Sequence, residues 1–234
     1  MLRDGWSSTI TPYGRLHARR AASRFILSAP HGTHDSHTGE IARRVSERLS
    51  WNCVVAEGFS PEGTRINLNR PSEGVGLRPW EERRTDRARE SYQRYERTLR
   101  TLGVRRLALY AELHGNSRKN LRGVVEIACA GMAPSEARGI KDAFERALTR
   151  RELPALSIAV EGVDRITLKA RAAKQFGVLR ELRPAIHIEL PNRLRWQHRE
   201  ELIAFVAGAL AHISSQHLTS TLSDRGSRVE SPAQ

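Results

Sequence analysis

The chain has 234 residues, of which 39% are hydrophobic, and this length suits one α/β domain or one domain with tails. Its first twenty residues hold no apolar stretch of signal-peptide length, and no segment approaches the roughly 18 apolar residues of a membrane span. We therefore expect a cytoplasmic protein without a membrane partner. The two cysteines, Cys53 and Cys129, lie in apolar runs and are expected to be reduced core residues.

The net charge of +13 comes almost entirely from arginine, because lysine occurs only at positions 119, 141, 169 and 174. Arginines are interleaved with acids, as in residues 81–100 (EERRTDRARESYQRYERTLR), which is typical of a solvated helix face with salt bridges. A compositional bias toward arginine produces the same charge, so we do not expect nucleic-acid binding as the main function. The alternative is a metal-free protein on the same fold that binds nucleic acid or another anionic polymer through its arginine-rich surface.

Apolar runs alternate with helical runs from Arg24 onward, which predicts a three-layer α/β fold. Residues 1–23 show no clear period and are expected to form a peripheral N-terminal extension. Residues 24–213 are expected to form a single α/β hydrolase-like domain, and the polar residues 214–234 a disordered tail. The patterns predict strands near 24–30, 52–57, 64–68, 105–113, 123–129, 156–161 and 184–190, and helices near 38–49, 79–102, 134–150, 168–175 and 196–215.

Three of these predicted strands end close to a side chain that can bind a metal or act as a base. The first leads into His31, the fourth into His114, and the last carries Glu189 near its end. Ligands and catalytic groups collect at the carboxyl ends of strands in α/β sheets. Two imidazoles and a carboxylate at one such edge predict a hydrolytic zinc centre with a nearby carboxylate base.

The loop after the first strand (PHGTHDSHTGE, residues 30–40) offers the remaining ligand in two ways. His31 can act with Asp35, or His37 can act with Glu40 on one face of a helix start. We favour the first choice because His31 already stands at a strand end, whereas Glu40 is also explained as a carboxylate on the helix dipole. A catalytic zinc site usually has three protein ligands plus water, and His114 is the candidate for the third.

Glu189 is the candidate acid/base, since a carboxylate facing a zinc-bound water can take its proton and hand it to a leaving amine. A salt bridge from Glu189 to Arg193 or Arg195 is the structural alternative.

Residues 64–71 (TRINLNRP) end in Asn69 and Arg70, a pair that predicts a site for a substrate carboxylate. Arginine binds a carboxylate through two parallel hydrogen bonds, and asparagine adds a neutral donor. Arg65 is a second candidate cation. A turn held by Asn-Arg-Pro is the structural alternative.

Three motifs follow one another along the chain: Pro30-His31-Gly32, Asn69-Arg70-Pro71 and Leu113-His114-Gly115-Asn116. In this order they resemble the N-formylglutamate amidohydrolase family and its relatives, the phage-type poly-γ-glutamate hydrolases and zinc carboxypeptidases. The stretch HGTHDSHTGEIA also resembles the poly-γ-glutamate hydrolase pattern HGGGIEPGTSEIA with one residue deleted. Two positions depart from these patterns, because Asp35 stands where those hydrolases have glutamate and Asn67 stands where a DxNRP motif has aspartate.

The resemblance covers about residues 24–190. It implies a three-layer α/β/α sandwich with a mixed central sheet, phosphorylase/hydrolase-like and of the zinc carboxypeptidase type. It implies Zn²⁺ held by His31, Asp35 and His114, with Glu189 as the catalytic acid/base. The substrate-binding candidates are Arg70, Asn69, Arg65 and Asn116.

We therefore expect a zinc-dependent amidohydrolase or carboxypeptidase-like enzyme. Its substrate would be an N-acyl amino acid similar to N-formylglutamate, or a γ-glutamyl or other peptide, with a free carboxylate.

Overall fold

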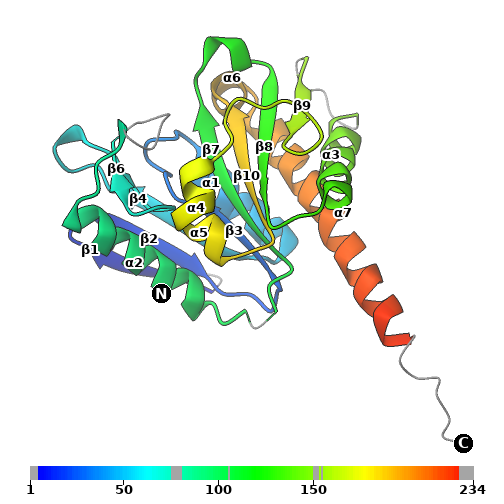
Figure 1. The fold of residues 1–234 in the computed structure, drawn as a ribbon, viewed down its shortest axis with the longest axis horizontal. Helices are drawn as coiled ribbons and strands as arrows, with labels where there is room; N and C mark the ends of the chain where they lie inside the picture. Colours follow the sequence, from blue (N-terminus) through cyan, green and yellow to red (C-terminus); the bar gives the residue numbers. More distant parts are fainter. Residues whose placement is uncertain (1–4, 75–80, 105, 150–152, 154, 227–234) are drawn as a thin grey trace, which may run out of the picture.

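A mixed sheet of eight strands forms the centre of the protein, and helices cover both of its faces in the computed structural model (Figure 1). The structure describes residues 5–74, 81–104, 106–149, 153 and 155–226, with only the backbone described for 217–226. The strand order is β1-β2-β4-β3-β7-β10-β8-β9, and β4, β3, β7 and β10 are parallel to one another. The strands are β1 (Trp6–Thr11), β2 (Gly14–Arg19), β3 (Phe25–Ala29), β4 (Asn52–Gly58), β7 (Leu109–Asn116), β8 (Val124–Ala130), β9 (Ser157–Val160) and β10 (Ala185–Pro191).

Two groups of helices enclose this sheet. Helices α1 (Thr38–Leu49), α3 (Pro134–Leu148) and α7 (Arg199–Gly226) pack on one face, while α2 (Asp86–Thr101), α4 (Arg171–Phe176) and α5 (Val178–Glu181) lie on the other. The short helix α6 (Asn192–Gln197) links β10 to α7. A separate two-stranded sheet pairs β5 (Ile66–Asn67) with β6 (Ser72–Glu73), and single 3-10 turns occur at η1 (Pro61–Gly63) and η3 (Lys119–Leu121).

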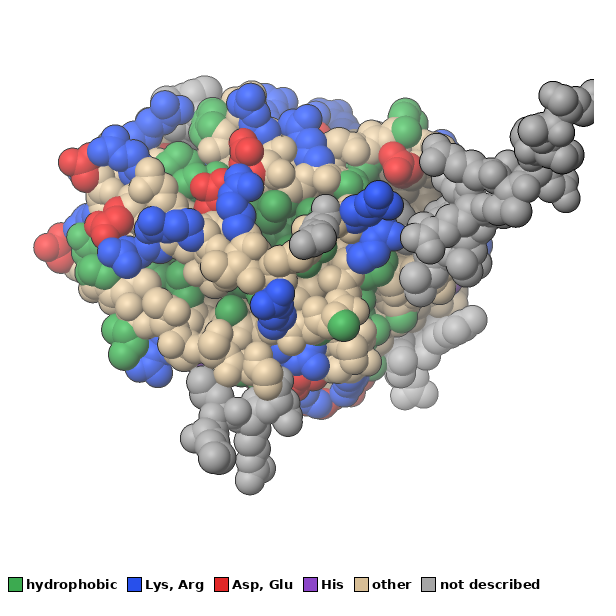
Figure 2. All heavy atoms as spheres, turned by 90° about the horizontal axis from the view of Figure 1, so that it is seen from below, with side chains coloured by type: hydrophobic (Ala, Val, Ile, Leu, Met, Phe, Trp, Pro, Cys, Tyr) green, Lys and Arg blue, Asp and Glu red, His purple; other side chains and the backbone are tan. Residues whose placement is uncertain are grey.

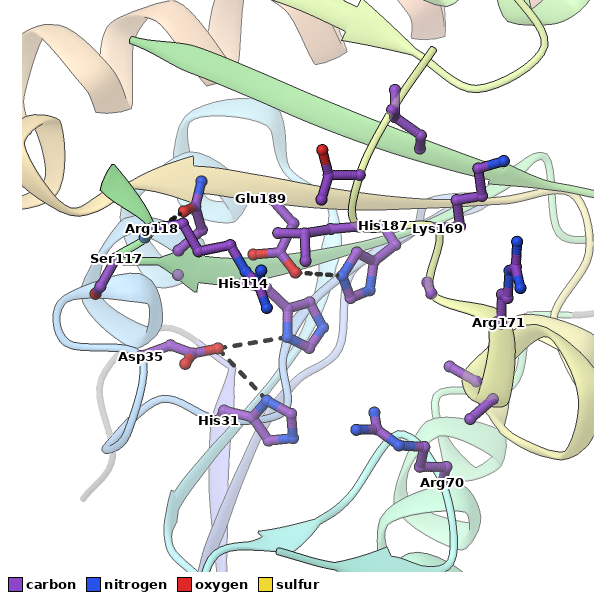
Figure 3. Close-up of a pocket in the computed structure, with 18 of the residues that line it drawn as sticks. His31, Asp35, Arg70, His114, Ser117, Arg118, Lys169, Arg171, His187 and Glu189 are labelled. Atoms are coloured by element: carbon purple, nitrogen blue, oxygen red, sulfur yellow. Dashed lines mark hydrogen bonds and ion pairs between the residues drawn. The ribbon is translucent and has the colours of Figure 1, made fainter. Parts of the chain in front are cut away.

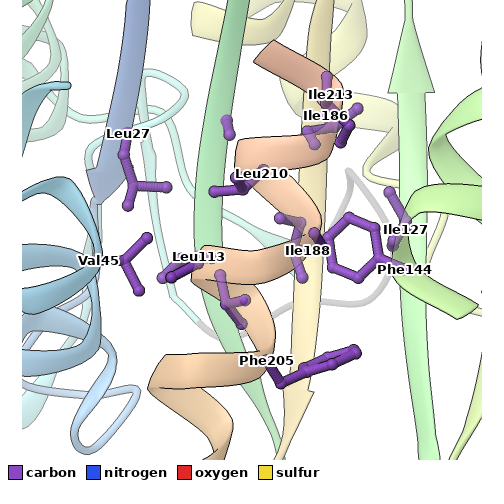
Figure 4. Close-up of a cluster of buried hydrophobic side chains, with 14 of the residues drawn as sticks. Leu27, Val45, Leu113, Ile127, Phe144, Ile186, Ile188, Phe205, Leu210 and Ile213 are labelled. Atoms are coloured by element: carbon purple, nitrogen blue, oxygen red, sulfur yellow. The ribbon is translucent and has the colours of Figure 1, made fainter. Parts of the chain in front are cut away.

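Alternation along the strands divides the buried side chains between the two faces. On β10, Ile186 and Ile188 join the core under α3 and α7, which Figure 4 shows with Phe144 and Phe205. The intervening residues His187 and Glu189 point to the opposite face. Polar side chains that carry chemistry therefore lie on the face of α2, α4 and α5, at the carboxyl ends of the parallel strands.

Helix α2 has the salt-bridged surface that its sequence predicted. Its N-terminal residue is capped by Thr85, whose hydroxyl accepts a hydrogen bond from the backbone of Ala88 at 3.2 Å. Arg94 pairs with Glu90, and Arg100 pairs with Glu96, each one helical turn apart.

The described part of the expected N-terminal extension belongs to the sheet. Residues 6–19 form the β1–β2 hairpin, and β2 pairs with β4 in antiparallel register. This hairpin was missed because its edge strand is mostly exposed, with Ile10 75% accessible, so no apolar face appears in the sequence.

Two further boundaries differ from expectation. The predicted strand at 64–68 shortens to the two residues of β5, since its chain turns at once into β6. The predicted disordered tail is helical as far as Gly226, because α7 continues beyond the part that packs on the sheet, and the remaining tail lies outside the described residues. Cys53 is buried and Cys129 half-buried, both free. Among the described residues, no helix combines the length and hydrophobicity that crossing a bilayer requires.

Candidate metal centre

A tight loop after β3 brings Asp35 back over His31. The backbone N–H of Asp35 donates to the carbonyl of His31 at 2.8 Å, and the Thr38 hydroxyl donates to the Asp35 carbonyl at 2.7 Å. His114 arrives from β7, the strand that pairs with β3. All three side chains are buried.

The three expected ligands meet in one place (Figure 3). Oδ2 of Asp35 lies 3.4 Å from Nδ1 of His31 and 3.4 Å from Nδ1 of His114. One potential ligand atom from each residue lies within 4.8 Å of the others. Two imidazole nitrogens and a carboxylate oxygen at this spacing are a donor set that suits zinc.

The protonation states favour a cation at this point. Burial, and next the charge of Arg65, lower the pKa of His31 to about 3, so its ring is neutral and able to ligate. Nε2 of His31 has no hydrogen-bond partner among the described residues. Burial raises the pKa of Asp35, but hydrogen bonds to His114 and His31 outweigh it and hold that pKa well below its usual range. The residues present therefore fit a metal ion.

His37 and Glu40 lie apart from this group. Nδ1 of His37 is 2.8 Å from a guanidinium nitrogen of Arg199, and its ring meets Trp196 edge-on at 4.3 Å between centroids. Glu40 lies 3.2 Å from Arg199. The alternative pair thus belongs to the junction of α1 with α6 and α7.

A buried carboxylate behind His114 completes the arrangement. Oε1 of Glu112 lies 3.1 Å from Nε2 of His114 and accepts a hydrogen bond from Asn69 at 3.0 Å, while Oε2 accepts from the Tyr110 hydroxyl at 3.1 Å. Glu112 is fully buried. A carboxylate on the far nitrogen of a ligating histidine is the usual way that proteins orient such rings.

Glu112 also sets the charge of His114 in the absence of a metal. Burial lowers the pKa of His114, but the charge of Glu112 and a hydrogen bond to Asp35 raise it to about 9. The one signal for this role in the sequence is the two-residue spacing of Glu112 and His114, which puts both on one face of a strand.

Glu189 lies beside this centre, on the neighbouring strand. It pairs in register with His114, lines the same pocket, and its Oε1 lies 2.9 Å from Nε2 of His187. Neither Arg193 nor Arg195 forms an ion pair with it in the described part of the chain. Arg193 donates to Gln197, and Arg195 donates to the carbonyls of Leu190 and Ser36.

Arg195, which the sequence suggested only as a possible salt-bridge partner of Glu189, is a buried cation. Its guanidinium lies against Gly115, where a Cβ atom would stand only 2.5 Å from Cζ. Through its hydrogen bonds to Ser36 and Leu190, it ties the metal loop to the end of β10. Burial lowers its pKa, and the charges of Asp35 and Glu189 oppose that change.

A cavity of about 710 Å³ opens in front of the centre. Of the four predicted substrate-binding residues, Arg65, Arg70 and Asn116 line it, whereas Asn69 is fully buried and bridges Glu112 to Arg70. Nη1 of Arg65 lies 3.9 Å from Oδ1 of Asp35. Burial lowers the pKa of Arg65, an effect that the charge of Asp35 opposes.

No family model matches the chain, and no curated protein matches it significantly. Solved structures do match. A gene product of Agrobacterium tumefaciens is 15% identical over 88% of this chain and 94% of its own, with a TM-score of 0.53. Thrombin activatable fibrinolysis inhibitor is 10% identical over 91% of this chain and 69% of its own, also with a TM-score of 0.53. A bacteriophage poly-gamma-glutamate hydrolase is 12% identical over 92% and 93%, with a TM-score of 0.48.

At these identities the likeness concerns the fold. The chain shares with these structures a mixed central sheet between two layers of helices, so the expected α/β/α fold class is confirmed.

Proposed function

We propose that this chain is a zinc-dependent amidohydrolase with a carboxypeptidase-like site. Its substrate is an N-acyl amino acid similar to N-formylglutamate, or a γ-glutamyl or other peptide, with a free carboxylate. The observation that carries the proposal is the convergence of His31, Asp35 and His114, from two strands, at the mouth of a cavity that Glu189 also lines. His31, Asp35 and His114 would hold the metal.

A zinc ion bound there would polarise the scissile carbonyl and activate a water molecule. The chain's own residues supply the rest. Glu189 takes a proton from the attacking water and transfers it to the leaving nitrogen. Glu112 holds the His114 ring in place, and Arg65 lines the cavity with Nη1 3.9 Å from Oδ1 of Asp35. The guanidinium of Arg65 can donate to an oxygen on which negative charge develops.

The basic surface supports the alternative function less well. Figure 2 shows basic side chains spread over one face of the molecule, with acidic and hydrophobic side chains between them. A steep loss of affinity with salt, without hydrolysis, would indicate a nucleic-acid-binding protein instead.

Metal analysis of the purified protein, together with a hydrolysis screen of N-acyl amino acids and γ-glutamyl peptides, tests the proposal. We expect one zinc per chain and its loss in His31→Ala and in His114→Ala, with the fold kept. Full metal occupancy in both variants would refute the ligand assignment. A metal-free wild-type protein with no hydrolysis would favour the binding function.

A further inference from the structure

Arg70, the expected carboxylate-binding residue, already binds a carboxylate of the chain itself. Its Nε donates to Oε2 of Glu82 at 2.8 Å, and its Nη2 donates to Oε1 of the same group. The hydroxyl of Ser72 donates to Oε2 at 2.5 Å. Nη1 of Arg70 donates to Asn69 at 3.0 Å. The charge of Arg70 is thus balanced, and one full side of its guanidinium is occupied.

This pair is sheltered, and a substrate carboxylate would have to displace it. Only 12% of the Arg70 side chain and 4% of the Glu82 side chain are exposed. The backbone around Glu82 is held by the bridge between Glu73 and Arg83, with hydrogen bonds of 2.8 and 2.9 Å. A substrate carboxylate that takes the place of Glu82 on Arg70 would leave the sheltered carboxylate of Glu82 without a partner, which costs free energy. A substrate gains little by competing for Arg70.

The opposite wall of the cavity offers unpaired positive charge. Lys169 and Arg171 line the cavity across from Asp35 (Figure 3), and neither forms an ion pair with any acidic side chain that the structure describes. The nearby Lys174 differs, since it is paired with Glu161. Arg118 and Arg165 line the cavity as well, and neither forms an ion pair with an acidic side chain that the structure describes.

A buried carboxylate fixes the segment that carries this wall. Glu126 on β8 is 2% exposed and accepts hydrogen bonds from the backbone N–H groups of Thr167 and Leu168, at 2.7 and 2.9 Å. The same segment continues into α4 and then α5, whose first residue, Val178, donates its N–H to the Asn69 carbonyl at 2.9 Å. The position of Lys169 is therefore set by its anchored backbone, while its charge stays available.

We propose that Lys169 and Arg171, and not Arg70, receive the free carboxylate of the substrate. The inference rests on the proposed function, and it reassigns the specificity of the same cavity. Glu82 neutralises Arg70, so the pair presents no net charge to the cavity. The substrate then lies with its scissile amide at His31 and His114 and its carboxylate toward the start of α4.

The test measures binding of N-formyl-L-glutamate and of its uncharged diamide by calorimetry. The full chain carries Glu189→Gln, so that the probe is not consumed. Lys169→Ala/Arg171→Ala should weaken binding of the diacid by about tenfold or more, because the loss of even one charge-assisted hydrogen bond weakens binding by about that factor. Binding of the diamide should not change.

Two variants serve as controls. Arg70→Gln/Glu82→Gln removes both charges of the pair, keeps the net charge, and should change the affinity for the diacid by less than about threefold, because a balanced pair is replaced by a neutral one. Lys119→Ala/Arg138→Ala removes the same two positive charges as the test variant, but from exposed sites outside the cavity, and should have a similarly small effect.

The proposal is overturned if Arg70→Gln/Glu82→Gln abolishes binding of the diacid while Lys169→Ala/Arg171→Ala binds it with unchanged affinity. It is also overturned if the protein does not prefer the diacid to the diamide. Zinc content and hydrolysis are measured separately on the chain with Glu189 intact. If the protein has neither zinc nor turnover, but Lys169→Ala/Arg171→Ala still weakens binding of the diacid, then the proposed activity is wrong and the proposed anion site is right.

Discussion

His187 holds Glu189 through a hydrogen bond of 2.9 Å from Nε2 to Oε1, while its Nδ1 lies 2.6 Å from the buried carboxylate of Glu112. The imidazole can donate to both carboxylates only when both of its nitrogens carry a proton. Its ring stacks on His114 with centroids 3.9 Å apart, which fixes its plane. The candidate base is therefore oriented by the same buried carboxylate that orients a candidate metal ligand.

Glu189→Gln should keep zinc and bind substrate, while turnover falls by about two to four orders of magnitude, the usual contribution of a positioned acid/base group. The amide has nearly the same shape but cannot accept the proton of the attacking water. Metal analysis and steady-state kinetics of the purified variant check this prediction. Near-normal turnover would remove Glu189 from the chemistry. Glu112 could not replace it, since Glu112 is fully buried behind His114 and does not line the cavity.

His187→Gln should lower kcat by roughly 10–100-fold, the range seen when partners that orient a metal site are removed. KM should change little, because His187 contacts the carboxylates and not the expected position of the substrate carboxylate. Zinc content should stay near one per chain. A purely structural role would instead reduce thermal stability and metal content together, and a circular-dichroism melt of the variant distinguishes the two outcomes.

Zinc binding near pH 7.5 should release about one proton per site, because His114 must lose its proton in order to ligate. In the metal-free protein the pKa of His114 is raised to about 9, against the lowering effect of burial, by Glu112 and Asp35. Calorimetric titration with zinc in buffers of different ionisation enthalpy measures this release, which should vanish above about pH 10. Glu112→Gln should reduce the release at pH 7.5, since it removes the charge that holds the proton.

The same shifts predict the stability of the metal-free protein. A raised pKa means that the folded state binds the proton more tightly, so the stabilisation from His114 is complete below pH 6.5 and is lost as the pH rises through about 9. The lowered pKa of His31 acts in the opposite sense, and stability declines as the pH falls from 6.5 toward about 3. Denaturant unfolding across this range, with His31→Asn as the comparison, should show a weaker acid-side decline in the variant.

Gly115→Ala should destabilise the protein by about 1–3 kcal/mol, the usual cost of overpacking. The new Cβ would stand 2.5 Å from Cζ of Arg195, a buried side chain held by backbone carbonyls. Gly208→Ala in α7 is the control, since its Cβ would meet only Ala147 at an ordinary 3.6 Å. Denaturant melts should show no loss in the control, because alanine is the better helix former. Equal stability of the two variants would contradict this account of Gly115.

The sequence predicted those parts of the site whose positions follow from a general rule of α/β folds. His31, His114 and Glu189 follow or end parallel strands, and such strands share one edge, so their convergence could be expected without a structure. The pairing of Arg70 with Glu82 could not, because no local rule places a side chain twelve residues further along the chain beside Arg70. The surroundings of His37 could not be predicted either. Its position in the loop is compatible with a metal ligand, but its contacts, Trp196 and Arg199, lie about 160 residues further along the chain.

The register between β7 and β10 has a consequence for how this site can vary. Glu112 stands opposite His187, and His114 opposite Glu189, so four chemically active side chains occupy a two-by-two block on one face of the sheet. The residues between them, such as Leu113 and Ile188, fill the core on the other face. Inserting or deleting one residue within either strand would exchange the two sets and bury the polar groups in the core. Variation in length is therefore tolerable only in the loops around the block, where the walls of the cavity are built.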